Sequence, residues 1–252
     1  MNDSARFCIF IGHQRSSHSI IGSLLDAHPS IIISHELHAL KYIEQGCDRN
    51  QLFMKIIALS YKQAKSGRRQ GPYSYVVPNQ WQGTYRSLEV IGDKKGGGTT
   101  DLLGKNYDLL KTLQEVVKLE LKIIHVIRNP YDNISTMLRW SRLPGSIDPL
   151  VDTINIYFKQ SATNARIRKD YPEKVHQIKH EDFINDPAFH LKRLCQFLGV
   201  DASDDYLSDC TSIVYKKPNR SRYEFQWKKD LIDMVEKKSE CYDFLRGYSY
   251  YD

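Results

Sequence analysis

The residues best suited to chemistry form a polar stretch directly after the first apolar run of the chain. The run ends at Gly12, residues 14–19 read QRSSHS, and an apolar pattern of helical spacing follows. A strand, a tight loop and a helix in that order direct backbone N–H groups at one point beside a helix N-terminus, which attracts anions. The spacing has the outline of the phosphate-loop pattern G-x-x-x-x-G-K-[ST], with Ser17 and His18 in place of the second Gly and the Lys. The sequence therefore predicts a phosphate-binding site here.

Polar residues also follow three other apolar runs. His35 and Glu36 come after 31–33, Lys94 after 88–92 and Arg128 after 122–127. The carboxyl ends of parallel strands meet at one edge of a sheet, where open α/β folds bind their ligands. We therefore expect these side chains to converge on the phosphate loop.

Alternating strands and helices must position these residues. The patterns predict strands over 7–11, 31–33, 88–92, 122–127 and 175–178, and helices over 18–27, 39–63 (broken around Gly46), 106–118, 131–140, 150–170, 187–198 and 227–240. Residues 93–100, with three glycines, and the basic residues 216–222 are predicted to be loops. The alternation predicts a three-layer α/β/α fold with a central parallel sheet, similar to that of P-loop NTPases.

The length of 252 residues suits one domain spanning 1–252. Within it, residues 39–87 are interpreted as an insertion that forms a lid or binds an acceptor. Its irregular part, 65–87, carries aromatic surface that favours an ordered segment over a disordered one.

Composition narrows the class of ligand. The net charge of +6 favours anions, but the basic residues are scattered rather than gathered in the dense stripe of a nucleic-acid binder. Five widely spaced cysteines without a C-x-x-C pair predict neither a zinc site nor a disulfide framework. No membrane span or secretory signal is visible, so we expect a cytoplasmic protein that binds neither membrane nor nucleic acid. Oligomeric state is not readable from the sequence.

Three motifs together resemble the sulfotransferases that use 3′-phosphoadenosine 5′-phosphosulfate (PAPS). Residues 14–29 are similar to the family's 5′-phosphosulfate loop, in the form P-R-S-G-T-T…L-D-A-H-P of tyrosylprotein and many bacterial sulfotransferases. Residues 126–137 resemble the 3′-phosphate motif R-[DN]-P-x-x-x-x-x-S, and residues 179–199 the segment Y-E-D-L…D-P…F-L-G. The resemblance implies transfer of the PAPS sulfuryl group to an acceptor hydroxyl of a small molecule, carbohydrate or protein residue. Adenosine 3′,5′-bisphosphate (PAP) is then released, and no metal is required.

The resemblance also implies roles for individual residues. The 5′-phosphosulfate would be bound by Arg15, Ser16, Ser17, His18 and Ser19. The 3′-phosphate would be held by Arg128 and Thr136, with Ser135 as the alternative to Thr136, and Arg220, Ser221 and Arg222 would close over the nucleotide.

Sulfuryl transfer needs a base for the acceptor proton and positive charge near the transferred group. Glu36 is the candidate base, on the expectation that partial burial raises its pKa. His35 and His38 compete with it, since an imidazole already titrates near pH 7. Lys94 would neutralise the developing charge.

Two departures from the family pattern leave alternatives open. Ser17 replaces a Gly, so its backbone must avoid positive φ or be strained. His18 replaces a Thr and places a bulky titratable group at the loop. The alternatives are a P-loop kinase or NTPase, against which the missing Lys argues, and a non-catalytic nucleotide-binding relative.

Overall fold

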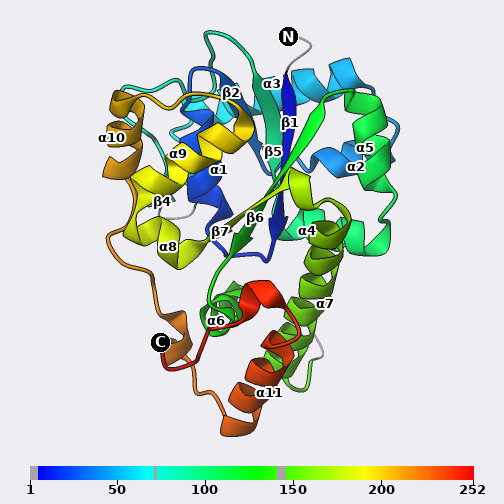
Figure 1. The fold of residues 1–252 in the computed structure, drawn as a ribbon, viewed down its shortest axis with the longest axis vertical. Coiled ribbons are helices and arrows are strands. Elements are labelled where there is room, and N and C mark those ends of the chain that lie inside the picture. The colour runs from blue at the N-terminus through cyan, green and yellow to red at the C-terminus, as the bar shows by residue number, and fades with distance from the viewer. Residues whose placement is uncertain (1–4, 71–72, 141–145) are drawn as a thin grey trace.

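The fold is built on a parallel sheet whose central strand leads into the phosphate loop. The computed structural model describes residues 5–70, 73–140 and 146–252. Five parallel strands pair in the order β2-β5-β1-β6-β7. Their bounds are β1 (Arg6–Gly12), β2 (Ile31–His35), β5 (Val90–Lys94), β6 (Glu120–Ile127) and β7 (Val175–Lys179). All five therefore end at the same edge of the sheet (Figure 1).

Helices connect these strands and surround the sheet (Figure 1). They are α1 (His18–Asp26), α2 (Ala39–Glu44), α3 (Arg49–Lys65), α4 (Gly97–Lys105), α5 (Leu109–Val117), α6 (Pro130–Trp140), α7 (Pro149–Asp170), α8 (His180–Asn185), α9 (Pro187–Leu198), α10 (Asp204–Ser212) and α11 (Lys229–Ser239). Two-residue strands β3 (Arg69–Gln70) and β4 (Tyr73–Ser74) pair with each other apart from the main sheet.

Side-chain alternation along β1 explains the three layers. Phe7, Ile9 and Ile11 pack with residues of α2, α3 and α5 on one face of the sheet. Cys8 and Phe10 face the opposite way and pack with α1, α8, α9 and α10. A third apolar cluster joins α6, α7 and α11, which lie beyond the carboxyl ends of the strands in Figure 1. This arrangement confirms the three-layer α/β fold around a parallel sheet.

The glycine-rich stretch differs from its prediction as a loop. Val90–Lys94 is strand β5, and α4 begins at Gly97, so only residues 95 and 96 connect the two elements. Glycine has a low intrinsic helix propensity, and the sequence pattern therefore favoured a loop. An added Cβ at position 96 would come within 2.7 Å of His18, and one at position 97 within 2.6 Å of Gln14, so the phosphate loop requires glycine at both positions. Helices α8 and α10 were also absent from the predicted elements.

The described part of 65–87 is ordered and packs on the core. The Asp26 carboxylate, buried at the end of α1, accepts hydrogen bonds from Ile33 N, Ser60 Oγ and Gly83 N and is ion-paired with Arg68. One buried carboxylate thus ties β2, α3 and the irregular segment together. The interpretation of 39–87 as a lid or an acceptor-binding insertion stays a prediction.

Candidate active site

The phosphate loop, residues 12–19, has the backbone geometry of an anion cradle. It joins β1 to the N-terminus of α1, as the sequence predicts. Arg15 and Ser17 both have a left-handed backbone, with φ of 68° and 74°. Ser17 caps α1 but makes no side-chain capping bond to it. Ser17 therefore does not avoid positive φ: its backbone is strained, because the loop keeps a conformation that favours glycine.

Helix α6 and Arg128, the residue that follows β6, hold this loop in position. Ser16 Oγ donates to Asn133 Oδ1 at 2.5 Å, and Asn133 Nδ2 donates to the Gln14 carbonyl at 2.5 Å. Arg128 Nη1 donates to the Arg15 carbonyl at 3.1 Å. The hydroxyl of Ser16 thus donates its hydrogen bond within the protein. Asn133, which the sequence-based site did not include, fixes the loop's position.

The His18 ring is buried in the protein and is not placed to act as a cationic ligand for an anion. The ring is buried, its Nε2 lies 3.0 Å from the Ile11 carbonyl, and burial lowers its pKa to about 4. It occupies a slot between Gly12 and Gly96, where an added Cβ would come within 2.9 Å and 2.7 Å of ring atoms. His18 is therefore neutral at neutral pH and serves the packing of the loop, although it still borders the cavity described next.

The loop borders a cavity of about 600 Å³ at the carboxyl ends of β1, β2 and β5. Three cationic side chains and one carboxylate line it: Arg15, Lys94, Lys95 and Glu36. The neutral lining residues are Gln14, Ser17, His18, Ser19, His35, Gln63, Gly97 and Gly98. The sheet edge therefore brings together the predicted loop, base and lysine, and it adds Lys95, which the sequence-based site lacked.

Glu36 is ion-paired through both of its carboxylate oxygens. Lys94 Nζ lies 2.9 Å from Oε1, and Lys95 Nζ lies 2.7 Å from Oε2. The Lys94 ammonium is almost fully buried and also reaches Ser19 Oγ and His35 Nε2, each at 3.3 Å. Lys94 thus connects the candidate base to the phosphate loop.

These contacts reverse the expected pKa shift of Glu36. Burial alone would raise it, but the two ammonium groups hold the pKa of Glu36 down to about 2. Burial lowers the pKa of Lys94 to about 8, and burial together with the Lys94 charge lowers the pKa of His35 to about 3. The expectation of a raised Glu36 pKa is therefore wrong, because two cations outweigh partial burial.

Asp93 shapes the turn that presents Glu36. Its carboxylate accepts hydrogen bonds from three successive backbone N–H groups, those of residues 37, 38 and 39, at 2.8–3.0 Å. It also accepts from Ser34 Oγ at 2.8 Å. Glu36 and His38 in this turn have φ of 64° and 70°. Buried Asp93 stabilises a turn that would otherwise be strained, while His38 lies outside the residues that line the cavity.

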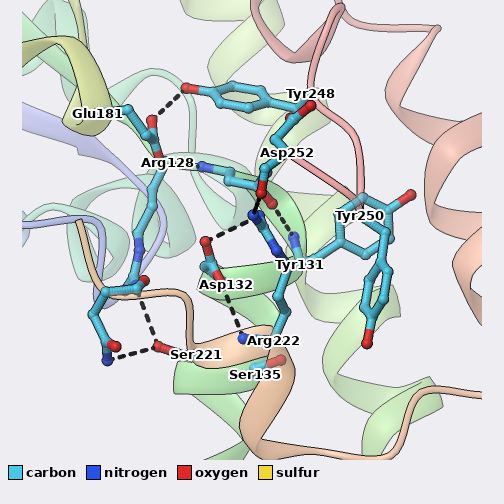
Figure 2. Close-up of polar contacts among 12 residues, drawn as sticks. Arg128, Tyr131, Asp132, Ser135, Glu181, Ser221, Arg222, Tyr248, Tyr250 and Asp252 are labelled. Atoms are coloured by element: carbon cyan, nitrogen blue, oxygen red, sulfur yellow. Dashed lines mark hydrogen bonds and ion pairs between the residues drawn. The ribbon is translucent and has the colours of Figure 1, made fainter. Parts of the chain in front are cut away.

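A second polar cluster forms around Arg128 at the end of β6 (Figure 2). Arg128 donates to Thr136 Oγ1 at 3.2 Å, to Ser221 Oγ at 3.1 Å and to the Asn219 carbonyl at 2.7 Å. Its buried Nε has no hydrogen-bond partner among the residues that the structure describes. The structure therefore brings together the Arg128 guanidinium and the hydroxyls of Thr136 and Ser221.

The other residues assigned to this end do not share the cluster. Ser135 Oγ accepts a hydrogen bond from Trp227 Nε1 at 3.0 Å, so Thr136 is the hydroxyl beside Arg128. Arg222 is buried and ion-paired with Asp132 at 3.2 Å, which fastens the late loop to α6 (Figure 2). Arg220 is exposed.

The residues that the structure describes offer neither a metal site nor a membrane-spanning helix. Among them, no group of three or more His, Cys, Asp or Glu side chains is arranged to hold a metal ion. None of the described helices is long and apolar enough to cross a membrane.

The fold and site define an α/β protein with a phosphate loop and two cationic clusters suited to a multiply charged anion. The model of the sulfotransferase family matches residues 8–204. The chain belongs to the sulfotransferase family and is a sulfotransferase.

Solved structures agree with this fold. The sulfotransferase domain from the curacin biosynthetic pathway has a TM-score of 0.61 and 16% identity, covering 95% of this chain and 98% of that one. The sulfotransferase domain from the Synechococcus PCC 7002 olefin synthase has a TM-score of 0.56 and 18% identity, covering 96% of this chain and 97% of that one. A sulfotransferase from Mycobacterium avium has a TM-score of 0.56 and 11% identity, covering 95% of this chain and 77% of that one. No curated protein sequence matches the chain.

Proposed function

We propose that the protein transfers the sulfuryl group of PAPS to an acceptor hydroxyl and releases PAP. The observation that carries this proposal is a physical link between the two cationic clusters. The Arg128 guanidinium donates to the carbonyl of Arg15 in the phosphate loop and to Ser221 in the late loop. A donor with anionic groups at both its 5′ and 3′ positions suits two clusters joined in this way.

The cavity residues would divide the work of the transfer. Glu36 would accept the acceptor's proton while the acceptor oxygen forms a bond to sulfur. The bond from sulfur to the bridging phosphate oxygen breaks, and its electron pair stays on the departing PAP. Lys94, held between Glu36 and Ser19, would offset the charge that develops on the transferred group.

Features of the loop argue against the kinase and NTPase alternative. Those enzymes use a loop lysine on the β- and γ-phosphates. Here His18 takes that position, and its ring is buried with a lowered pKa. The cations face the cavity from other elements, namely Lys94 and Lys95 at the end of β5.

We further propose a cytoplasmic setting and an acceptor drawn from small molecules, carbohydrates or protein residues. The five cysteines are all free thiols, and three of them are buried. Free thiols are typical of a reducing compartment.

Calorimetry with PAP in the presence of EDTA tests the proposal directly. We expect saturable 1:1 binding of PAP without Mg²⁺ and no binding of Mg-ATP at matched concentrations. Binding of Mg-ATP alone would instead support the kinase alternative. Binding of PAP without sulfate transfer from radiolabelled PAPS, across a broad hydroxyl-compound screen, would support the non-catalytic alternative.

The isosteric substitution Glu36→Gln tests the base. It is expected to abolish transfer while leaving PAP affinity within about threefold, because Glu36 contacts lysines rather than the phosphate loop backbone. His35→Gln is the matched control from the neighbouring position. Full activity of Glu36→Gln with loss of activity in His35→Gln would move the base to His35.

A further inference from the structure

The candidate base Glu36 is ion-paired with two neighbouring lysines, Lys94 and Lys95. Both oxygens of Glu36 face ammonium groups, at 2.9 Å and 2.7 Å. A carboxylate paired in this way resists protonation and is a poor acceptor for a hydroxyl proton. One of the two lysines must therefore be drawn away before Glu36 acts as a base.

Lys94 and Lys95 differ in their freedom to leave Glu36. The Lys94 side chain is 2% exposed, passes against Gly22 and contacts Ser19 and His35 as well. The Lys95 side chain is 25% exposed, and its ammonium is paired with Glu36. Lys95 is therefore the lysine that an incoming ligand recruits with less disruption.

The Lys95 side chain lies closely against Gly98. A Cβ at position 98 would lie 2.8 Å from Lys95 Cε and 2.9 Å from its Cγ, so Gly98 provides the surface on which the Lys95 stem lies. The stem thus crosses the first turn of α4, whose N-terminus adds positive potential. The Lys95 ammonium lies in positive surroundings, balanced by a single shared carboxylate.

The charges in the cavity favour movement of Lys95 from Glu36 to an incoming anion. Arg15, Lys94 and Lys95 line it against Glu36 alone, while His18 and His35 are held neutral by their lowered pKa values. His38 beside the turn also has a pKa lowered by burial, and Asp93 already accepts four hydrogen bonds. A sulfuryl group entering this cavity competes with Glu36 for a cation.

We infer that Lys95 is a donor-sensing residue, which pairs with Glu36 in the free enzyme and moves to the sulfuryl group of the bound donor. Glu36 is then released to accept the acceptor's proton. The donor consequently binds before the acceptor binds productively. This inference rests on the proposed function, because it takes PAPS as the donor.

Donor affinity tests the inference without knowledge of the acceptor. If Glu36 and the donor compete for Lys95, Glu36→Gln must tighten PAPS binding, by about tenfold for one charge-assisted contact freed in a partly exposed site. The same substitution made in a Lys95→Met background is expected to change PAPS affinity by less than threefold. Lys95→Arg keeps the charge and is expected to retain the tightening. Calorimetry on the wild-type protein, the three single variants and the two double variants measures each value.

PAP is the matched control ligand, since it lacks the sulfuryl group. We expect Glu36→Gln to leave its affinity within threefold of the wild-type value. Unchanged PAPS affinity in Glu36→Gln, equal tightening for PAP, or tightening that persists with Lys95→Met would each overturn the inference. Failure of the wild-type protein to bind either nucleotide would instead contradict the proposed function.

Gly98→Ala provides a second perturbation if a Lys95 variant does not fold. It displaces the Lys95 stem while keeping its charge, and we expect it to reduce the tightening caused by Glu36→Gln. An undiminished tenfold gain in that background would also contradict the role of Lys95.

Discussion

Replacing Asp93 by Asn tests whether one buried carboxylate holds the turn that carries Glu36, the candidate base. Each oxygen of Asp93 accepts two hydrogen bonds: Oδ1 from Ser34 Oγ and Leu37 N, and Oδ2 from His38 N and Ala39 N. An asparagine has the same shape but turns one acceptor into an N–H donor. The two donors bonded to the replaced oxygen therefore lose their acceptor, either the pair on Oδ1 or the pair on Oδ2.

The size of the effect follows from those two lost contacts. Hydrogen bonds to a charged group contribute roughly 1.5–3 kcal/mol each, and part of this is regained because the neutral amide is less costly to bury. We expect Asp93→Asn to lower the free energy of unfolding by about 3 kcal/mol. At roughly 2–4 °C per kcal/mol for a chain of this size, the melting temperature falls by about 6–12 °C.

Calorimetric melting and PAP titration together separate the turn from the phosphate loop. Asp93→Asn is expected to keep PAP affinity within about threefold, because its contacts lie in 34–39 rather than in 12–19, and to reduce sulfate transfer. The control Ser34→Ala removes one neutral donor, worth about 1 kcal/mol. A melting temperature within 2 °C of wild type for Asp93→Asn would refute the reasoning.

Three further predictions address the loop, the buried lysine and acid stability. Ser17→Gly is expected to raise the free energy of unfolding by up to about 1 kcal/mol, since relief of roughly 1–2 kcal/mol of left-handed strain exceeds the entropy cost of glycine; a lower melting temperature would contradict it. Gly22→Ala places a Cβ 3.0 Å from Lys94 Cγ and is expected to lower sulfate transfer several-fold in initial-rate assays, whereas an unchanged rate would show that the stem adapts freely. Burial lowers the pKa of His13 to about 3 and of His18 to about 4, below 6.5 in the unfolded chain, so the unfolded state binds more protons as pH falls. Urea unfolding at pH 7, 6 and 5 should show stability lost below pH 6.5, by about 2 kcal/mol per histidine at pH 5, and equal stability at pH 7 and 5 would exclude this linkage.

The parts of the fold that could be predicted are those governed by local pattern. Apolar, β-branched runs gave the five strands, and the polar residues at their ends did converge on one cavity. Parallel pairing makes that convergence a consequence of order along the chain. Phosphate-loop spacing likewise predicted the start of α1 at His18.

The missed features depend on contacts between distant segments. Asp93 is an acid at a strand end, and nothing in its neighbourhood in the sequence shows that three backbone N–H groups of another connection surround it. The pKa of Glu36 depends on the side chains of Lys94 and Lys95, which pairing of β2 with β5 brings close. The sequence does show a second lysine beside Lys94, but only the pairing register of β2 with β5 shows that this lysine reaches Glu36.

The slot that holds His18 has a consequence for substitutions at positions 18 and 96. A ring at position 18 fits because position 96 has no side chain, and a Cβ there would come within 2.8 Å of three ring atoms. Gly96 also has a φ of 56°, so the backbone favours glycine there whatever residue stands at position 18. The dependence therefore runs one way: His18 needs Gly96, whereas a smaller residue at position 18 would still leave glycine favoured at 96. A side chain at position 96 is expected to displace the His18 ring and, with it, the phosphate loop.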